Sequence, residues 1–220
     1  ESGVARIWLN RPERHNALDE SLVHDLHKAI DRFTDDAAVR AIVIGAEGPS
    51  FCAGADPEWT RRVMQLDAAD NFSDACQFSA LLLAIACSRK PVIARVQGQA
   101  LGGGVGLIAA CDIAIGASSA QFALTEVRCG LAAATASPYV LAALGARQTR
   151  RLMLTGERFN AAEAHIFGLL HTVVPAEGLD AEVGRLVSLL KLGGPHAQAQ
   201  VKDLVQSFDG EPWSRELAEE

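Results

Sequence analysis

Short apolar runs recur along the first two-thirds of the chain, separated by stretches with helical spacing. The runs have the length and composition of buried strands, and they occupy residues 4–9, 41–44, 91–96, 113–115 and 121–124. Strands that alternate with helices in this way favour an α/β fold with largely parallel strand pairing.

Apolar residues at helical spacing predict the intervening helices. Asp19 can cap a helix whose apolar face is formed by Leu22, Leu26, Ala29, Ile30 and Phe33. A longer helix is expected over residues 68–87, with an inward face of Phe78, Leu81, Leu82 and Ile85. Beyond Thr135 the chain is predicted to be mainly helical, over residues 140–144, 149–154, 161–167, 179–192 and 195–208.

Two loops of small residues each follow a predicted strand. One contains Gly102-Gly103-Gly104 and leads into an apolar helix over residues 105–110; the other is Phe51-Cys52-Ala53-Gly54-Ala55-Asp56. Unpaired N–H groups at a helix start can bind an anion or a developing oxyanion. Two such loops could bring two donors to one point, as acyl transfer or enolate chemistry requires. The glycines alone fit a tight turn without a ligand equally well.

Composition and charge narrow the classes of function. The 220 residues are 49% hydrophobic, which is enough for one large domain, and the net charge of −7 argues against a nucleic-acid partner. No apolar run reaches the roughly 18 residues of a membrane helix, and no signal peptide is evident. The five cysteines form no CxxC pair, which favours a reducing, cytoplasmic location. His24 and His27 lack further ligands nearby, so no metal site is expected.

Several short motifs occur in order along nearly the whole chain. They are Leu9-Asn10-Arg11-Pro12-Glu13, Asn16-Ala17-Leu18, the two small-residue loops, Lys90-Pro91-Val92-Ile93-Ala94, Ala110-Cys111-Asp112-Ile113-Ala114, Gln121-Phe122, Glu126, Gly130-Leu131, Leu154-Thr155-Gly156 and Val173-Val174-Pro175. Together they resemble the crotonase, or enoyl-CoA hydratase/isomerase, superfamily.

The resemblance implies a fold that the hydrophobic pattern alone does not predict. This is the crotonase (ClpP-like) spiral of ββα units, with two roughly perpendicular sheets that are ringed by helices and followed by C-terminal helices. Residues 1–193 would form the spiral core, and residues 194–220 would begin the C-terminal helical region. A homotrimer or a dimer of trimers is the assembly that the resemblance implies.

The same resemblance implies a coenzyme A thioester as substrate and no separate cofactor. Matched onto this sequence, the backbone N–H groups that hold the thioester oxygen belong to Ala55 and Gly103. Arg14, Ala17, Ala53 and Asp56 would line the path of the CoA moiety, largely through backbone, with Arg14 as the contact to a phosphate. A solvated surface arginine is the alternative for Arg14.

Typical hydratases of this superfamily use two glutamates, and this chain matches only one. Glu126 stands at the second position, whereas Gly106 occupies the first. If Glu126 is buried beside the thioester, its raised pKa would suit acid/base chemistry. The alternative is a surface glutamate that ends a strand. A single carboxylate can still shuttle a proton, as in the double-bond isomerases of the superfamily.

Two further stretches resemble one branch of the superfamily. Gly104-Val105-Gly106-Leu107 and Ser137-Pro138-Tyr139 are similar to the methylglutaconyl-CoA and isohexenylglutaconyl-CoA hydratases, which act in leucine and acyclic terpene breakdown. Gly106, Gly130, Ser137 and Tyr139 are therefore candidate substrate-pocket residues. For Ser137 and Tyr139, a helix N-terminus packed on the core is an equally good interpretation. Trp59, Met64 and Phe78 are possible pocket walls, with core packing as the default.

Two other functions remain open from the sequence. Residues 104–109 fit the pattern G-x-G-x-x-A, with Glu126 about 20 residues further on, which is the fingerprint of a dinucleotide-binding dehydrogenase. That interpretation leaves the 51–56 loop unexplained. The missing first glutamate also permits a non-catalytic crotonase homologue that binds acyl-CoA without turnover.

Overall fold

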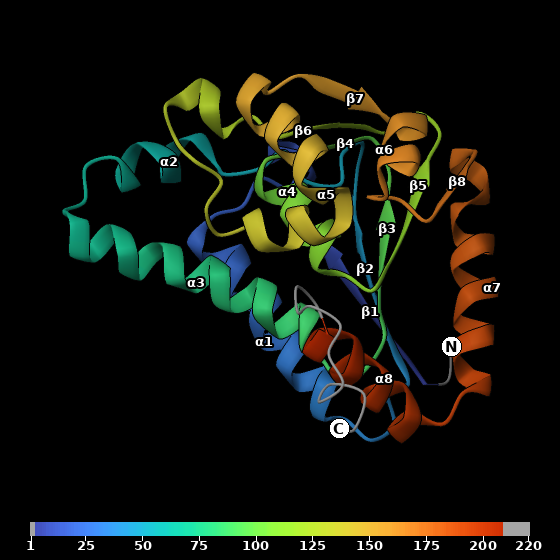
Figure 1. The fold of residues 1–220 in the computed structure, drawn as a ribbon. Helices are drawn as coiled ribbons and strands as arrows, with labels where there is room; N and C mark the ends of the chain where they lie inside the picture. The colour runs from blue at the N-terminus through green and yellow to red at the C-terminus, as the bar shows by residue number, and fades with distance from the viewer. Residues whose placement is uncertain (1–2, 209–220) are drawn as a thin grey trace.

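The computed structural model describes residues 3–208, and its larger sheet runs in the order β1–β2–β3–β5–β8 with every pair parallel (Figure 1). Its strands are β1 (Val4–Leu9), β2 (Ala41–Ala46), β3 (Val92–Val96), β5 (Ile113–Ala117) and β8 (Thr172–Val174). Every residue of β2 is buried, as expected for a parallel strand covered on both faces.

A second, smaller sheet lies across the end of the first, and in Figure 1 its strands run across the view near the top. It contains β4 (Gln99–Leu101), β6 (Gln121–Ala123) and β7 (Arg158–Asn160) in that order. β4 pairs with β6 in parallel, and β6 pairs with β7 antiparallel. Only two residues separate β3 from β4, so the chain passes directly from one sheet into the other.

Helices cover both faces of the larger sheet. The helices of the described residues are α1 (Glu20–Asp35), α2 (Pro57–Val63), α3 (Ala68–Ala86), α4 (Gly103–Ala110), α5 (Ser137–Thr155), α6 (Ala161–Phe167), α7 (Leu179–Leu192) and α8 (Pro195–Phe208), with 3₁₀ turns η1 (Pro12–Arg14), η2 (Glu126–Cys129) and η3 (Ala176–Gly178). Val43 on β2 packs in the cluster under α7, whereas its neighbours Ile42 and Ile44 pack in the main core with α1, α3 and α4. Alternate residues of one strand therefore serve two cores.

Most predicted elements are confirmed, and the exceptions have physical reasons. The helices predicted over 140–144 and 149–154 are confirmed: α5 spans both, and the chain leaves the helical conformation between them at Gly145, where φ is +70° and ψ is 158°. The sequence pattern missed β4, β7 and β8, which are three residues long and carry no apolar run, and it left α2 unassigned. Glu126 begins a 3₁₀ turn instead of ending a strand.

The proposed division at residue 194 stays a prediction. α7 ends at Leu192 and α8 begins at Pro195, while residues 209–220 of the predicted C-terminal region lie outside the described residues. α8 is tied to the core by the Lys202–Asp112 ion pair at 2.7 Å and by Gln206, whose amide donates to the carbonyl of Ala86. Among residues 3–208, no helix has both the length and the apolar character needed to cross a membrane.

The turn that joins the two sheets leads to a test of the fold. Gly98 has a φ of +62°, and a Cβ there would overlap the carbonyl oxygen of Pro49. We expect Gly98→Ala to lower the free energy of unfolding by about 2–4 kcal/mol, because neither backbone can move away easily. Gly184→Ala is the matched control: Gly184 lies in α7 with nothing within 4 Å of its Cβ position, so helix propensity predicts a small gain. Urea denaturation measures the free energy of unfolding of both variants. Equal changes in Gly98→Ala and Gly184→Ala would contradict the predicted overlap with Pro49.

Candidate active site

The two small-residue loops lie directly against each other. Cys52 N–H donates to the carbonyl of Gln99 at 3.1 Å, and Leu101 N–H donates to the carbonyl of Cys52 at 2.9 Å. A Cβ on Gly54 would lie 2.9 Å from the Leu101 carbonyl oxygen, and one on Gly104 would lie 2.7 Å from that of Cys52. The backbones therefore approach this closely only because both positions are glycine.

This approach puts Ala55 and Gly103, the residues that follow Gly54 and Gly102, on adjoining loops. Leu18 forms a parallel bridge around Ala55: Leu18 N–H donates to Gly54, and Asp56 N–H donates to Leu18, each at 2.7 Å. Because those bonds use the groups on either side of Ala55, its own N–H faces away from Leu18. Gly103 is the first residue of α4 and has no acceptor within its helix. Neither N–H meets a hydrogen-bond acceptor within residues 3–208.

The side chain of Glu126 contacts the same glycine turn. Its Oε1 lies 2.8 Å from the Cβ position of Gly102, the residue before Gly103. Its Oε2 is buried, with no hydrogen-bond partner among the described residues. Burial raises the pKa of this carboxyl above its usual range, and a hydrogen bond from its own backbone only partly opposes that shift. An unpartnered, desolvated carboxyl is suited to proton transfer.

The neighbouring walls are apolar. The Cβ position of Gly103 lies 2.9 Å from Leu18 and 3.2 Å from Phe78, which supports Phe78 as a wall of this region although it also packs in the core. Gly106 is buried, and its Cβ position lies 2.8 Å from the Cβ of Ala136. A glutamate at Gly106 would therefore collide with Ala136. Ala136 thus fills the side-chain space beside Gly106, and the role of Gly106 in the substrate pocket stays a prediction.

The other three predicted pocket residues lie around η2 and the start of α5. Gly130 is exposed and ends η2 with a φ of +73°. The Ser137 hydroxyl donates to the carbonyl of Ala133 at 2.7 Å, as in a helix terminus packed on the core. Burial, followed by the charge of Cys87 at the end of α3, raises the pKa of the half-buried Tyr139 phenol. The role of these three residues in substrate binding stays a prediction.

A cavity of about 370 Å³ opens beside Ala55. It is lined by Arg14, His15, Ala17, Ala53, Ala55, Pro57, Glu58 and Arg61, so it brings together three of the four residues predicted along the CoA path. Sequence reasoning missed Arg61 and His15, because no motif marks them. The guanidinium groups of Arg14 and Arg61 suit a phosphate.

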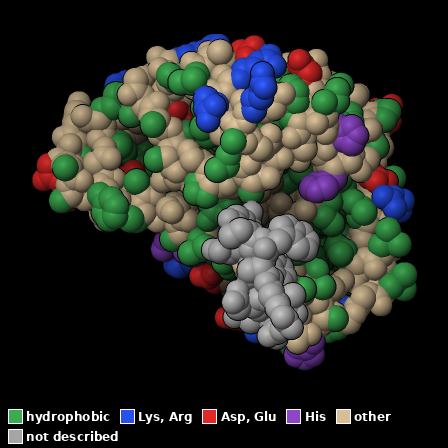
Figure 2. All heavy atoms as spheres, viewed as in Figure 1, with side chains coloured by type: hydrophobic (Ala, Val, Ile, Leu, Met, Phe, Trp, Pro, Cys, Tyr) green, Lys and Arg blue, Asp and Glu red, His purple; other side chains and the backbone are tan. Residues whose placement is uncertain are grey.

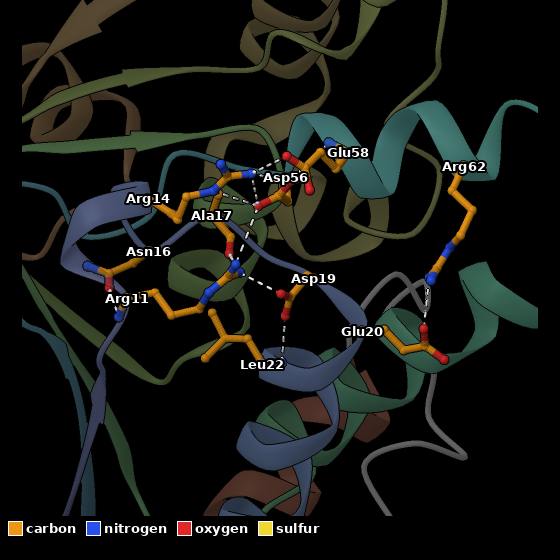
Figure 3. Close-up of polar contacts among 10 residues, drawn as sticks. All are labelled: Arg11, Arg14, Asn16, Ala17, Asp19, Glu20, Leu22, Asp56, Glu58 and Arg62. Carbon is orange, nitrogen blue, oxygen red and sulfur yellow. Dashed lines mark hydrogen bonds and ion pairs between the residues drawn. The ribbon is translucent and has the colours of Figure 1, made fainter.

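Asp56, the fourth predicted residue, does not line this cavity; it lines a neighbouring cavity of about 400 Å³ together with Arg11 and Asp19. Its carboxylate points toward the guanidinium groups of Arg14 and Arg11 (Figure 3). Its side chain is only 4% exposed, and it receives hydrogen bonds from Arg14 and from the backbone N–H of Glu58. Burial alone would raise the pKa of Asp56, but the Glu58 N–H and the arginines Arg14 and Arg11 hold that pKa below its usual range. Its carboxylate is therefore ionised and fully engaged within the protein.

Comparisons with known proteins agree with this geometry. The family described as enoyl-CoA hydratase/isomerase matches residues 1–213. The chain belongs to the enoyl-CoA hydratase/isomerase family. The enoyl-CoA hydratase AKT6-1 of Alternaria alternata is 32% identical over 231 residues, covering 100% of this chain and 74% of that protein.

Solved structures support the family and its fold. A crystal structure of an enoyl-CoA hydratase from Shewanella pealeana is 35% identical with a TM-score of 0.97, covering 100% of this chain and 82% of that one. AtuE of Pseudomonas aeruginosa is 33% identical with a TM-score of 0.94, covering 100% of this chain and 85% of that one. The crotonase fold is thus confirmed, and the protein is an enzyme of CoA thioesters.

The family assignment excludes the dinucleotide-binding alternative, and the structure supplies the reason. In that fingerprint the glycines form the turn before a helix. Here residues 104–109 lie inside α4, which begins at Gly103. The glycines of this chain allow close packing against Cys52 and Ala136 and do not form a phosphate-binding turn.

The buried Glu126 predicts a measurable effect on stability. A pKa that is raised in the folded state means that ionisation opposes folding. This penalty is absent below the pKa of the unfolded chain, about 4.3, and complete above the folded pKa. We therefore expect Glu126→Gln to raise the free energy of unfolding at pH 8 and to match the wild type at pH 4.

Glu157→Gln is the matched control for this measurement. Glu157 accepts a hydrogen bond from Arg151 at 2.8 Å, which lowers its pKa, so the same substitution should not stabilise the protein at pH 8. Urea denaturation at the two pH values gives the result. A Glu126→Gln protein that is less stable than the wild type at pH 8 would show that the carboxylate is favourably solvated or paired.

Proposed function

We propose that this enzyme is an enoyl-CoA hydratase that acts on a branched glutaconyl-CoA type of substrate similar to 3-methylglutaconyl-CoA. The observation that carries the proposal is the position of Glu126, whose carboxylate contacts the glycine turn that presents the Gly103 N–H. In this proposal, Glu126 acts as proton donor and acceptor next to two backbone donors that hold the thioester oxygen.

Ala55 and Gly103 would stabilise the charge that develops during the reaction. Addition of water to the double bond places negative charge on the thioester oxygen as an enolate forms. Two backbone donors aimed at that oxygen need no reorganisation during the reaction, and loss of one such donor typically costs about 10²–10³ in rate. The apolar neighbours Leu18 and Phe78 exclude water and strengthen these hydrogen bonds.

Glu126 would move the proton. Its carboxylate takes a proton from water as the water oxygen bonds to Cβ, and it returns that proton to Cα, so that the elements of water are added and the carboxylate is regenerated. One carboxylate suffices for both transfers. This scheme accommodates the absence of a second glutamate, because Ala136 fills the space beside Gly106.

The acyl group is inferred from residue patterns. Gly104-Val105-Gly106-Leu107 and Ser137-Pro138-Tyr139 are similar to glutaconyl-CoA hydratases, whose substrates carry a second carboxylate at the far end. We expect that such a substrate tolerates a water-activating arrangement with one glutamate. Leucine or acyclic terpene breakdown would be the metabolic setting.

A second candidate reaction is supported by the single carboxylate itself. A double-bond isomerase needs one group that removes a proton from one carbon of the acyl chain and returns it to another, and Glu126 could do this. A general enoyl-CoA hydratase and a non-catalytic acyl-CoA-binding homologue complete the alternatives. The substrates and variants below separate all four.

The CoA moiety would lie in the cavity beside Ala55, with a phosphate near Arg14 and Arg61. CoA is part of the substrate, so no separate cofactor is proposed, and the location is proposed to be cytoplasmic. Apolar side chains reach the surface in several places, including Leu154, Ile166 and Leu192 (Figure 2 shows one face). They support a homotrimer or a dimer of trimers, which light scattering after size exclusion can test.

Loss of the enoyl-thioester absorbance tests the function directly. We expect the wild type to hydrate 3-methylglutaconyl-CoA rapidly and crotonyl-CoA slowly, and Glu126→Gln to lower the rate by about 10²–10⁴, because the acid/base group is gone. Rapid hydration by Glu126→Gln would contradict the role of Glu126. Hydration of both substrates at equal rates would indicate a general hydratase.

The matched control is Glu13→Gln, which removes a carboxylate of the exposed turn η1 and should leave the rate unchanged. Chromatography of the products detects migration of the double bond. Migration without addition of water would indicate the isomerase. Binding of both acyl-CoAs without any turnover would indicate the non-catalytic homologue.

A further inference from the structure

Asp56 joins two arginines to the loop that presents Ala55 (Figure 3). Arg14 donates from Nη2 to both carboxylate oxygens at 3.0 Å and from Nε to Oδ2 at 3.3 Å. Arg11 Nη2 forms an ion pair with Oδ2 at 3.5 Å, and the N–H of Glu58 donates to Oδ1 at 2.9 Å. The carboxylate therefore caps α2 and pairs with two guanidinium groups at once.

Arg11 connects this carboxylate to the rest of the scaffold. Its Nη1 donates to the carbonyl of Ala17 at 2.8 Å and pairs with Asp19 at 2.7 Å. Asp19 in turn caps α1 through the N–H of Leu22. A single guanidinium therefore holds the start of α1 and the end of the 51–56 loop together.

The loop is held on its inner side as well. The fully buried Asn16 accepts from the N–H of Arg11 and donates to the carbonyls of Glu47 and Ser50, each at 2.8 Å. Leu18 bridges the groups on both sides of Ala55. Ala55 itself makes no hydrogen bond through its N–H within residues 3–208, so the direction of that N–H depends on its neighbours.

We infer that Asp56 is a positioning residue for the oxyanion hole: its carboxylate, held by Arg11 and Arg14, sets the direction of the Ala55 N–H. This inference rests on the proposed function, because it assumes that Ala55 donates to a thioester oxygen. It also assigns Asp56 a role other than contact with CoA. Both oxygens of Asp56 already accept hydrogen bonds from the protein, so a substrate group could bind them only by displacing an arginine.

The test uses Asp56→Asn and a thioester that cannot react. Asparagine keeps the shape and one oxygen for the Glu58 N–H, but it loses the charge that holds two guanidinium groups. Butanoyl-CoA labelled with carbon-13 at the thioester carbonyl is saturated, so it binds without turnover. Isotope-edited infrared difference spectra of the bound ligand report how strongly hydrogen bonds polarise that carbonyl.

We expect the wild type to shift the bound carbonyl band to lower frequency and Asp56→Asn to lose a large part of that shift. With the reactive substrate, kcat should fall about tenfold, less than the 10²–10³ for a lost donor, while KM changes by less than about threefold. A role confined to stability would leave both the carbonyl band and kcat of the folded protein unchanged. Asp56→Ser, which retains a capping side chain, serves as a second variant.

Glu20→Gln is the matched control. Glu20 pairs with Arg62 of α2 at 2.8 Å but has no contact with the Ala55 loop, so its loss should leave the carbonyl band and kcat unchanged. An unshifted carbonyl band in the wild type would overturn the proposed oxyanion hole. A shifted band in the wild type that is the same in Asp56→Asn and Asp56→Ser would overturn the positioning role alone.

Discussion

The candidate active site depends on the contact between two backbone loops, because that contact joins the segments that carry the predicted donors Ala55 and Gly103. Cys52 exchanges hydrogen bonds with both ends of β4, and glycines at positions 54 and 104 remove the Cβ atoms that would separate the loops. The two sheets meet at this point, since β3 passes into β4 through the turn at Gly98. The contact that joins the two sheets therefore also fixes the positions of the loops that form the candidate site.

Two carboxylates near this contact, those of Glu126 and Asp56, differ in their partners. Glu126 is desolvated and its Oε2 has no partner within residues 3–208, which opposes ionisation on folding and fits the proton-transfer role proposed for it. Asp56, the residue after Ala55, is also removed from solvent but is paired with two arginines, which favours its ionised form and a fixed position. The two carboxylates therefore have opposite environments, and the unpaired one is the candidate for acid/base chemistry.

Much of the fold could be predicted from the sequence, because long amphipathic segments carry their own periodicity. The inward face of α3, which includes Phe78 and Leu82, is the one that the spacing predicted. β7 could not be predicted, since three residues with two exposed ends carry no pattern. α2 did carry a signal in Asp56-Pro57, a cap followed by proline, that could have been used.

The residues of the candidate site likewise fall into those that the sequence predicted and those that it did not. Ala55, Gly103 and Glu126 were predicted from the family resemblance, since each lies in a local motif. Arg61 of the cavity beside Ala55 was not predicted, because no motif marks it. The pairing of Asp56 with Arg14 was not predicted either, because it joins residues 42 positions apart.

The most direct test of the account is a crystal structure with bound butanoyl-CoA. The account predicts that the thioester oxygen lies about 2.7–3.1 Å from the backbone nitrogens of both Ala55 and Gly103, with Glu126 facing the carbons next to that carbonyl. A thioester oxygen bound elsewhere, or directed to solvent, would contradict it.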